Sequence, residues 1–156
     1  MDHTLTIHAD SLLQNDAAYI PTGIVEPVGT KRLANTLVRN KIVINNDYIS
    51  GLNDCYVLEE QAGTYHKLAA ELIELETGRT LEIFTTYPAL MVYTGDYLQS
   101  EHAGHKGELY KSFDGICLEC QRYPDSPNHS HFPTTVLNPG DTYHESIIYK
   151  FGTLSV

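Results

Sequence analysis

The chain of 156 residues has no tryptophan, only 4 phenylalanines and 2 methionines, and half as many basic as acidic side chains. Its 10 Lys and Arg against 20 Asp and Glu give a formal net charge of -10, and no basic run is present. Such a surface repels phosphate backbones and anionic membranes, so we expect no nucleic-acid partner and no membrane surface as partner. No apolar stretch approaches the roughly 20 residues of a membrane helix.

The sequence also has no Gly-rich phosphate loop and no Gly-x-Ser-x-Gly nucleophile motif, so neither nucleotide chemistry nor that class of hydrolase is expected. Met1 is followed by an acid and a histidine, unlike the basic and then apolar start of a secretion signal. We therefore expect a cytoplasmic protein. The cysteines are odd in number, which favours free thiols; they are Cys55, Cys117 and Cys120.

A metal site is the alternative use of these cysteines, because Cys117-x-x-Cys120 is followed by His129 and His131. In a strand, however, residues three apart point to opposite faces, and His-x-His lacks the spacing of a zinc finger's second half. We expect no metal and no cofactor.

Many short runs of strand-forming residues, separated by turn signals, dominate the remaining sequence. The segment 66–76 also fits a helical stripe, but the turn Thr77-Gly78-Arg79 leads into another β-rich run and favours a strand hairpin. Loops are expected at 99–113 and 128–133, and a loop or a short helical turn at 30–40. These patterns predict a single all-β domain over 1–156, a β-sandwich or barrel. The expected strands are 3–9, its partner at 24–28 after the turn 20–23, 41–44, 51–58, 66–76, 80–85, 90–94, 115–121 and 143–151.

The strand 115–121 carries an acid, Glu119, where a buried strand normally carries Val or Ile. The two-residue period places Glu119 on one face with Cys117 and Gln121, opposite Leu118 and Cys120. Apolar neighbours predict a partly desolvated carboxyl with a raised pKa, as a general base needs. The alternative is a solvent-exposed Glu on an ordinary sheet face.

A second candidate position lies at the start of the strand 51–58, where Gly51 and Leu52 precede Asn53 and Asp54. Polar side chains at a strand start can project into a cleft. The alternative is a plain Asn-Asp turn.

Three stretches together resemble the C-terminal half of the aldose 1-epimerase, or galactose mutarotase, family. They are Ile20 to Gly23, Tyr87 to Asp96, and Gly115 to Tyr143, which contains a Glu-bearing strand, a Pro-Asp-x-x-Asn turn, Phe-Pro and Val-Leu-x-Pro-Gly. The last stretch is the most specific. In order and spacing the resemblance covers nearly the whole chain, although family members are considerably longer.

The resemblance implies a β-supersandwich and the interconversion of α and β anomers of a hexose such as galactose or glucose. In the family a Glu takes the proton from the anomeric hydroxyl while a His protonates the ring oxygen, and Glu119 matches that base. The family's acidic sugar ligand falls on Asn53, with Asp54 one step along; only one of the two can face the sugar. Met91 stands where the family often has a polar residue, and Gln121 accompanies Glu119.

The family's acid His comes from the half that this chain lacks, and none of its histidines matches that motif. The resemblance therefore implies weak or no catalysis by this chain alone, since each proton transfer supplies about 10²–10⁴-fold. A half supersandwich also exposes strand edges and an apolar face. We expect a complementary N-terminal half or a second copy to cover that face. The alternative function is a non-catalytic carbohydrate-binding or interaction module.

Overall fold

The computed structural model describes residues 3–28, 42–44, 48–59, 63 and 65–154. Within these residues the secondary structure consists of short strands and one 3₁₀ turn. In chain order the elements are β1 (His3–Ile7), β2 (Ala9–Asn15), β3 (Pro21–Pro27), β4 (Ile42–Ile44), β5 (Tyr48–Ser50), β6 (Asn53–Leu58), β7 (Lys67–Glu74), β8 (Arg79–Thr85), β9 (Ala89–Tyr93), β10 (Cys117–Gln121), the turn Ser126–Asn128 and β11 (Ile147–Thr153).

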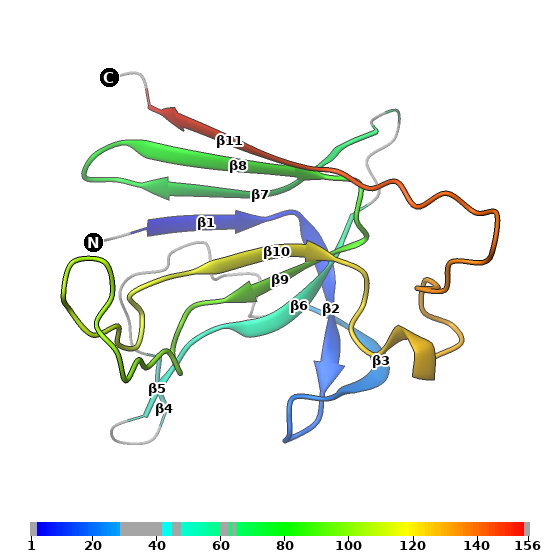
Figure 1. The fold of residues 1–156 in the computed structure, drawn as a ribbon, viewed down its shortest axis with the longest axis horizontal. Coiled ribbons are helices and arrows are strands. Elements are labelled where there is room, and N and C mark those ends of the chain that lie inside the picture. Colours follow the sequence, from blue (N-terminus) through cyan, green and yellow to red (C-terminus); the bar gives the residue numbers. More distant parts are fainter. Residues whose placement is uncertain (1–2, 29–41, 45–47, 60–62, 64, 155–156) are drawn as a thin grey trace.

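Two antiparallel sheets form the body of the fold (Figure 1). One has the strand order β1-β7-β8-β11 and the other β10-β9-β6-β2-β3, while β4 and β5 form a separate pair. The predicted all-β sandwich is therefore confirmed. In the part of the chain that is described, no helix is long and apolar enough to cross a membrane.

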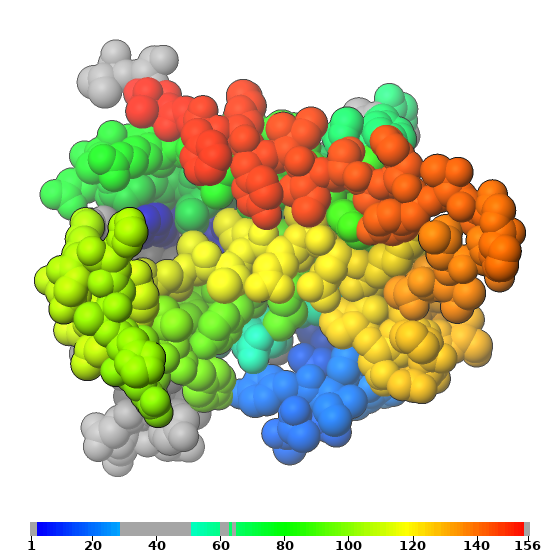
Figure 2. All heavy atoms as spheres, viewed as in Figure 1, coloured from blue at the N-terminus to red at the C-terminus, as the bar shows by residue number. Residues whose placement is uncertain are grey.

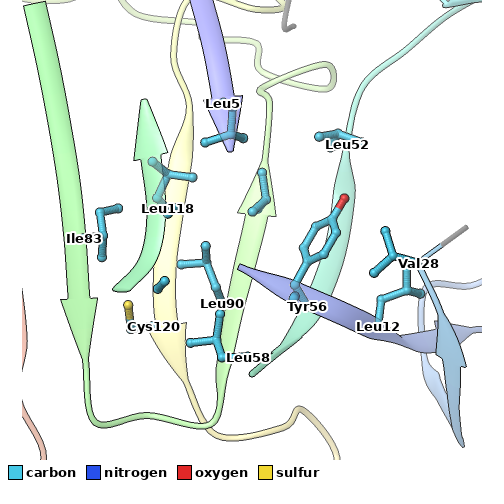
Figure 3. Close-up of a cluster of buried hydrophobic side chains, with 14 residues drawn as sticks. Leu5, Leu12, Val28, Leu52, Tyr56, Leu58, Ile83, Leu90, Leu118 and Cys120 are labelled. Carbon is cyan, nitrogen blue, oxygen red and sulfur yellow. The ribbon is translucent and has the colours of Figure 1, made fainter. Parts of the chain in front are cut away.

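The main core lies between the two sheets (Figure 3). Leu90 and Val92 of β9 and Ile83 of β8 are fully buried there, and Leu118 and Cys120 of β10 point into the same layer. Every second residue of these strands is apolar, so each strand presents one apolar face to the opposite sheet. Burying one such side chain stabilises the fold by about 1.5–3 kcal/mol.

The N-terminal segment differs from its prediction. Residues 3–9 are not one strand: β1 pairs with β7, the chain changes sheets at His8, and β2 then pairs with β3 and β6. The strand β2 is difficult to recognise in the sequence because its adjacent residues Leu12 and Leu13 are both buried. Leu12 lies in the main core and Leu13 in a second cluster. Both faces of β2 are thus covered, which removes the alternation that marks a half-buried strand.

The turn predicted at 20–23 is also misplaced. Pro21 pairs with Asn15 and belongs to β3. The chain reverses before Pro21, in residues 16–20, where the Asp16 carboxylate accepts the backbone N–H groups of Ala18 and Ile20. This is a side-chain turn of the kind that Asp favours.

Most of the other predicted elements are confirmed. The ambiguous segment 66–76 is the strand β7, and Gly78, with φ +70°, makes the turn into β8. The excursion 99–113 contains neither helix nor strand. The last strand begins four residues later than expected, at Ile147. The loop or short helical turn predicted at 30–40 lies outside the described residues.

Candidate functional site

Except for Asp54, the predicted site residues lie on the outer face of the five-stranded sheet, the face turned away from the main core. Strand register places them in cross-strand rows: Glu119 of β10 is paired with Met91 of β9, and Met91 with Cys55 of β6. Side chains in one row stand about 4.5–5.5 Å apart between neighbouring strands. The neighbouring rows are Cys117, Tyr93 and Asn53 on one side and Gln121, Ala89 and Val57 on the other.

Glu119 is exposed, which corrects the expectation of a partly desolvated carboxyl. Its neighbours Leu118 and Cys120 are buried, but they point to the opposite face and do not shield it. The carboxylate forms no hydrogen bond or ion pair with the residues that the structure describes. The Glu119 side chain is thus accessible to a ligand. The described residues do not shield its carboxylate from water.

Asn53 and Asp54 fall on opposite faces of β6. Asn53 pairs with Tyr93 and shares the outer face with Glu119, whereas Asp54 pairs with Val92, on the face of the main core. Two inter-strand spacings and two residues along the strand separate Asn53 from Glu119, about 12 Å between their backbones, so a ligand would have to lie between the two side chains to contact both. Of the two candidates, the structure therefore brings only Asn53 together with Glu119.

The entry to β6 is set by Gly51. A Cβ at this position would lie 2.1 Å from Thr94 Oγ1 and 2.8 Å from the Asp96 carboxyl. The space is occupied because Thr94 Oγ1 accepts the Leu52 N–H at 2.8 Å and Asp96 Oδ2 accepts the Gly51 N–H at 3.3 Å. These bonds to the loop after β9 fix where Asn53 begins its strand.

One end of the outer face is covered by the chain that follows β10. Phe132 is buried in a second apolar cluster with Leu13, Cys55 and Ala89, and Met91 packs against it. Burial, and secondarily the negative charge of Asp54, raises the pKa of Cys55 to about 12. Met91 therefore lies between a closed apolar end and the exposed carboxylate of Glu119.

The turn after β10 brings Phe132 back to the sheet. Asp125 adopts a left-handed conformation, with φ 61°, and its carboxylate accepts the side-chain N–H of Asn128. Ser126 Oγ donates to Tyr123 O at 2.7 Å. The Tyr123 ring meets Phe132 edge to face, with centroids 5.1 Å apart. The Pro-Asp-x-x-Asn pattern is thus a closed turn that positions an aromatic cover.

Two histidines of this segment contact β3: His129 is half-buried and His131 is exposed. His129 lies against the backbone of Gly23, with its ring atom Nδ1 2.6 Å from where a Cβ on that glycine would be. Its Nε2 lies 3.2 Å from Asp125 Oδ2. His131 Nε2 is 2.7 Å from Gly23 O. These contacts tie the turn to β3 and account for both histidines as structural groups.

The cysteines point as their spacing predicts. Cys117 is exposed and Cys120 is buried on the opposite face, and all three cysteines are free thiols. Among the described residues, no group of three or more His, Cys, Asp or Glu side chains is placed to hold a metal ion.

The family model of aldose 1-epimerase matches residues 1–150 of the chain. The chain belongs to the aldose 1-epimerase family. It is 36% identical over 151 residues to the galactose mutarotase of Mus musculus and 30% identical over 158 residues to the aldose 1-epimerase of Escherichia coli strain K12. It also superposes on the crystal structure of a GalM/aldose epimerase homologue from C. elegans with a TM-score of 0.85 and 26% identity, over 99% of the chain.

The chain is much shorter than these family members. The match covers 96% of the chain but only 44% of the mouse and 45% of the E. coli protein, and 46% of the C. elegans structure. The chain therefore spans about half the length of the relatives that it matches, with the fold of that half preserved.

Sequence reasoning missed Tyr93 on the outer face and Tyr149 on the neighbouring sheet. Tyr93 stands between Cys117 and Asn53, and its hydroxyl accepts the N–H of Tyr97 at 3.0 Å. Tyr149 of β11 donates to the Leu118 carbonyl, beside Glu119. The period of the strand containing Tyr93 could have placed that residue, but no local pattern relates residue 149 to residue 119.

Proposed function

We propose that this chain is the base-carrying half of an aldose 1-epimerase, which interconverts the α and β anomers of a hexose such as galactose or glucose. The supporting observation is that Glu119 presents an unengaged carboxylate on the same exposed sheet face as Asn53, Met91 and Gln121. Family membership supports the same reaction.

In the proposed reaction Glu119 accepts the proton of the anomeric hydroxyl while a separate acid gives a proton to the ring oxygen. The C1–ring oxygen bond breaks, the resulting C1 carbonyl rotates, and the ring oxygen attacks its other side. The protons then return, so the sugar differs only in its configuration at C1. A carboxylate within hydrogen-bond reach of that hydroxyl is suited to this step.

The neighbouring residues would hold the sugar. The amides of Asn53 and Gln121 each offer a donor and an acceptor to hydroxyl groups, although Asn53 supplies no charge. Met91, between Glu119 and Cys55, offers an apolar surface to the carbon face of the ring. The core-side placement of Asp54 favours Asn53 as the ligand at this position.

The proposed acid and the desolvation of Glu119 would come from a second polypeptide region. We propose that a complementary half of the family's fold provides both, because the relatives contain roughly as much chain again as is matched here. An apolar surface for it exists: Ile147, Tyr149 and Phe151 of β11 pair with the core-facing residues of β8, yet Phe151 is 77% exposed. A second copy of the chain is the other occupant for this surface.

Polarimetry of freshly dissolved α-galactose and α-glucose tests the proposal. We expect little acceleration by the chain alone, and a rate increase when it is combined with the unmatched region of a relative such as the mouse protein. Glu119→Gln should remove about 10²–10⁴-fold of that increase. The matched control is Glu26→Gln, a β3 carboxylate that bonds Gln14. An uncatalysed rate with the combined halves would exclude the enzyme.

A non-catalytic carbohydrate-binding module is the second candidate, and the exposure of Glu119 specifically favours it. This module would bind hexose at millimolar concentration without changing the rate of mutarotation. Amide shifts confined to the rows around Glu119 and Asn53, with background mutarotation even in the combined halves, are the expected result. Unchanged spectra would exclude sugar binding by this face.

A further inference from the structure

Tyr149 joins the two sheets beside the candidate base. Its strand, β11, belongs to the four-stranded sheet, and β10 belongs to the five-stranded sheet. The Tyr149 hydroxyl donates to the Leu118 carbonyl of β10 across this junction, at 2.9 Å. Figure 2 shows β11 (red) lying against β10 (yellow) on the front surface. Among the described strands, β10 has only β9 as a neighbour in its sheet.

The acceptor of this bond is the residue immediately before Glu119. The Leu118 carbonyl and the Glu119 N–H belong to one planar peptide unit, so holding the carbonyl restricts the rotation of that unit. The orientation of the unit helps set the direction in which the Glu119 side chain leaves the strand. A hydroxyl on the other sheet thus acts on the placement of this carboxylate.

Tyr149 is 45% exposed but directed toward the second sheet. Tyr149 pairs with Ile83, which is fully buried, so its side chain leaves β11 on the face toward the second sheet. Burial raises the pKa of Tyr149, and the electrostatic influence of Cys120 and Glu119 raises it further. The hydroxyl therefore stays protonated at neutral pH, and the Glu119 carboxylate lies close enough to influence it.

We propose that Tyr149 is a positioning residue for Glu119, holding the backbone of β10 at the peptide unit from which the Glu119 side chain leaves the strand toward the bound sugar. The need for such a restraint is clear from the surroundings of Glu119, which has no hydrogen bond or ion pair to any described residue. The role in sugar binding rests on the proposed function, whereas the restraint on the β10 backbone does not.

NMR of the intact chain tests the restraint without any sugar. Tyr149→Phe keeps the ring and removes the hydroxyl. The expected result is an upfield shift of the Leu118 carbonyl carbon, and a HN–Hα coupling of Glu119, which reports its backbone φ, that moves from the extended-strand value toward an averaged one. Tyr65→Phe is the matched control, because the Tyr65 hydroxyl also makes one bond, to His144 Nδ1 at 3.0 Å, away from β10. Couplings of Glu119 that are the same in wild type and Tyr149→Phe would overturn the proposal.

A second measurement relates the restraint to the reaction. In the combined halves that show mutarotation, Tyr149→Phe should lower kcat by about threefold to tenfold, the equivalent of one net hydrogen bond, with a smaller change in KM. Tyr65→Phe should leave both constants unchanged. If the combined halves are inactive, the proposed function fails, while the Glu119 couplings still decide whether Tyr149 restrains the β10 backbone. A loss confined to KM would count against positioning.

Discussion

The two faces of the five-stranded sheet are built from alternate residues of the same strands and differ in almost every property. The inner face, with Leu90, Val92 and Leu118, is closed by the second sheet. The outer face is apolar only at one end, where Phe132 covers it, and carries the exposed Glu119 at the other. Adjacent residues of a strand point in opposite directions, so the residues that stabilise the fold and those available to a ligand alternate along the same strands.

Replacing adjacent residues of β9, one on each face, should give the largest difference in the free energy of unfolding. Leu90 is fully buried between the sheets, so Leu90→Ala should lower the free energy of unfolding by about 2–5 kcal/mol. Met91, on the outer face, is only partly buried, and Met91→Ala should cost about 1 kcal/mol or less. Urea unfolding followed by tyrosine fluorescence measures both, since tryptophan is absent. Equal losses would mean that the outer face is as closely packed as the core.

Gly51→Ala should have the next largest effect, because the added methyl group would enter space held by Thr94 and Asp96. Forcing an extra carbon into such a site typically costs about 1–3 kcal/mol. The displacement should spread to Asn53, whose amide resonances should shift more than those of β7 in the other sheet. Gly115→Ala is the matched control for added volume, since nothing lies within 4 Å of a Cβ there and its backbone is not in the left-handed region.

Glu119→Gln should leave the free energy of unfolding within about 0.5 kcal/mol, because the exposed carboxylate makes no bond to any described residue. The same substitution is expected to remove the activity of the combined halves. Stability without activity is the signature of a residue retained for chemistry. A loss of several kcal/mol would instead identify Glu119 as a structural group whose partners lie outside the described residues.

The sequence predicts the stable face better than the functional one. Short strand-forming runs separated by turn signals were sufficient for the sandwich, and the two-residue period was sufficient for the two faces of β10. It failed at β2, where both faces are buried. It also misjudged the surroundings of Glu119: apolar neighbours in the chain do not shield a residue when they point to the opposite side. Nor could it relate Tyr149 to Leu118, a contact between residues 31 positions apart.

Thiol labelling gives the finest comparison, because Cys55 and Cys117 share the outer face but lie at its closed and open ends. Iodoacetamide at pH 8 should modify Cys117 quickly in the folded protein and leave Cys55 unmodified until unfolding. Burial raises the pKa of Cys55 to about 12, so its thiol remains neutral far above the ordinary value of 9.0. The neutral thiol favours the folded state, and this contribution is fully present below pH 9 and declines as the pH rises toward 12. Phe132→Ala should remove the cover and make Cys55 reactive. If Cys55 stayed protected in that variant, Met91 and Leu13 alone would be closing this end of the face, and the Phe-Pro segment would not serve as its cover.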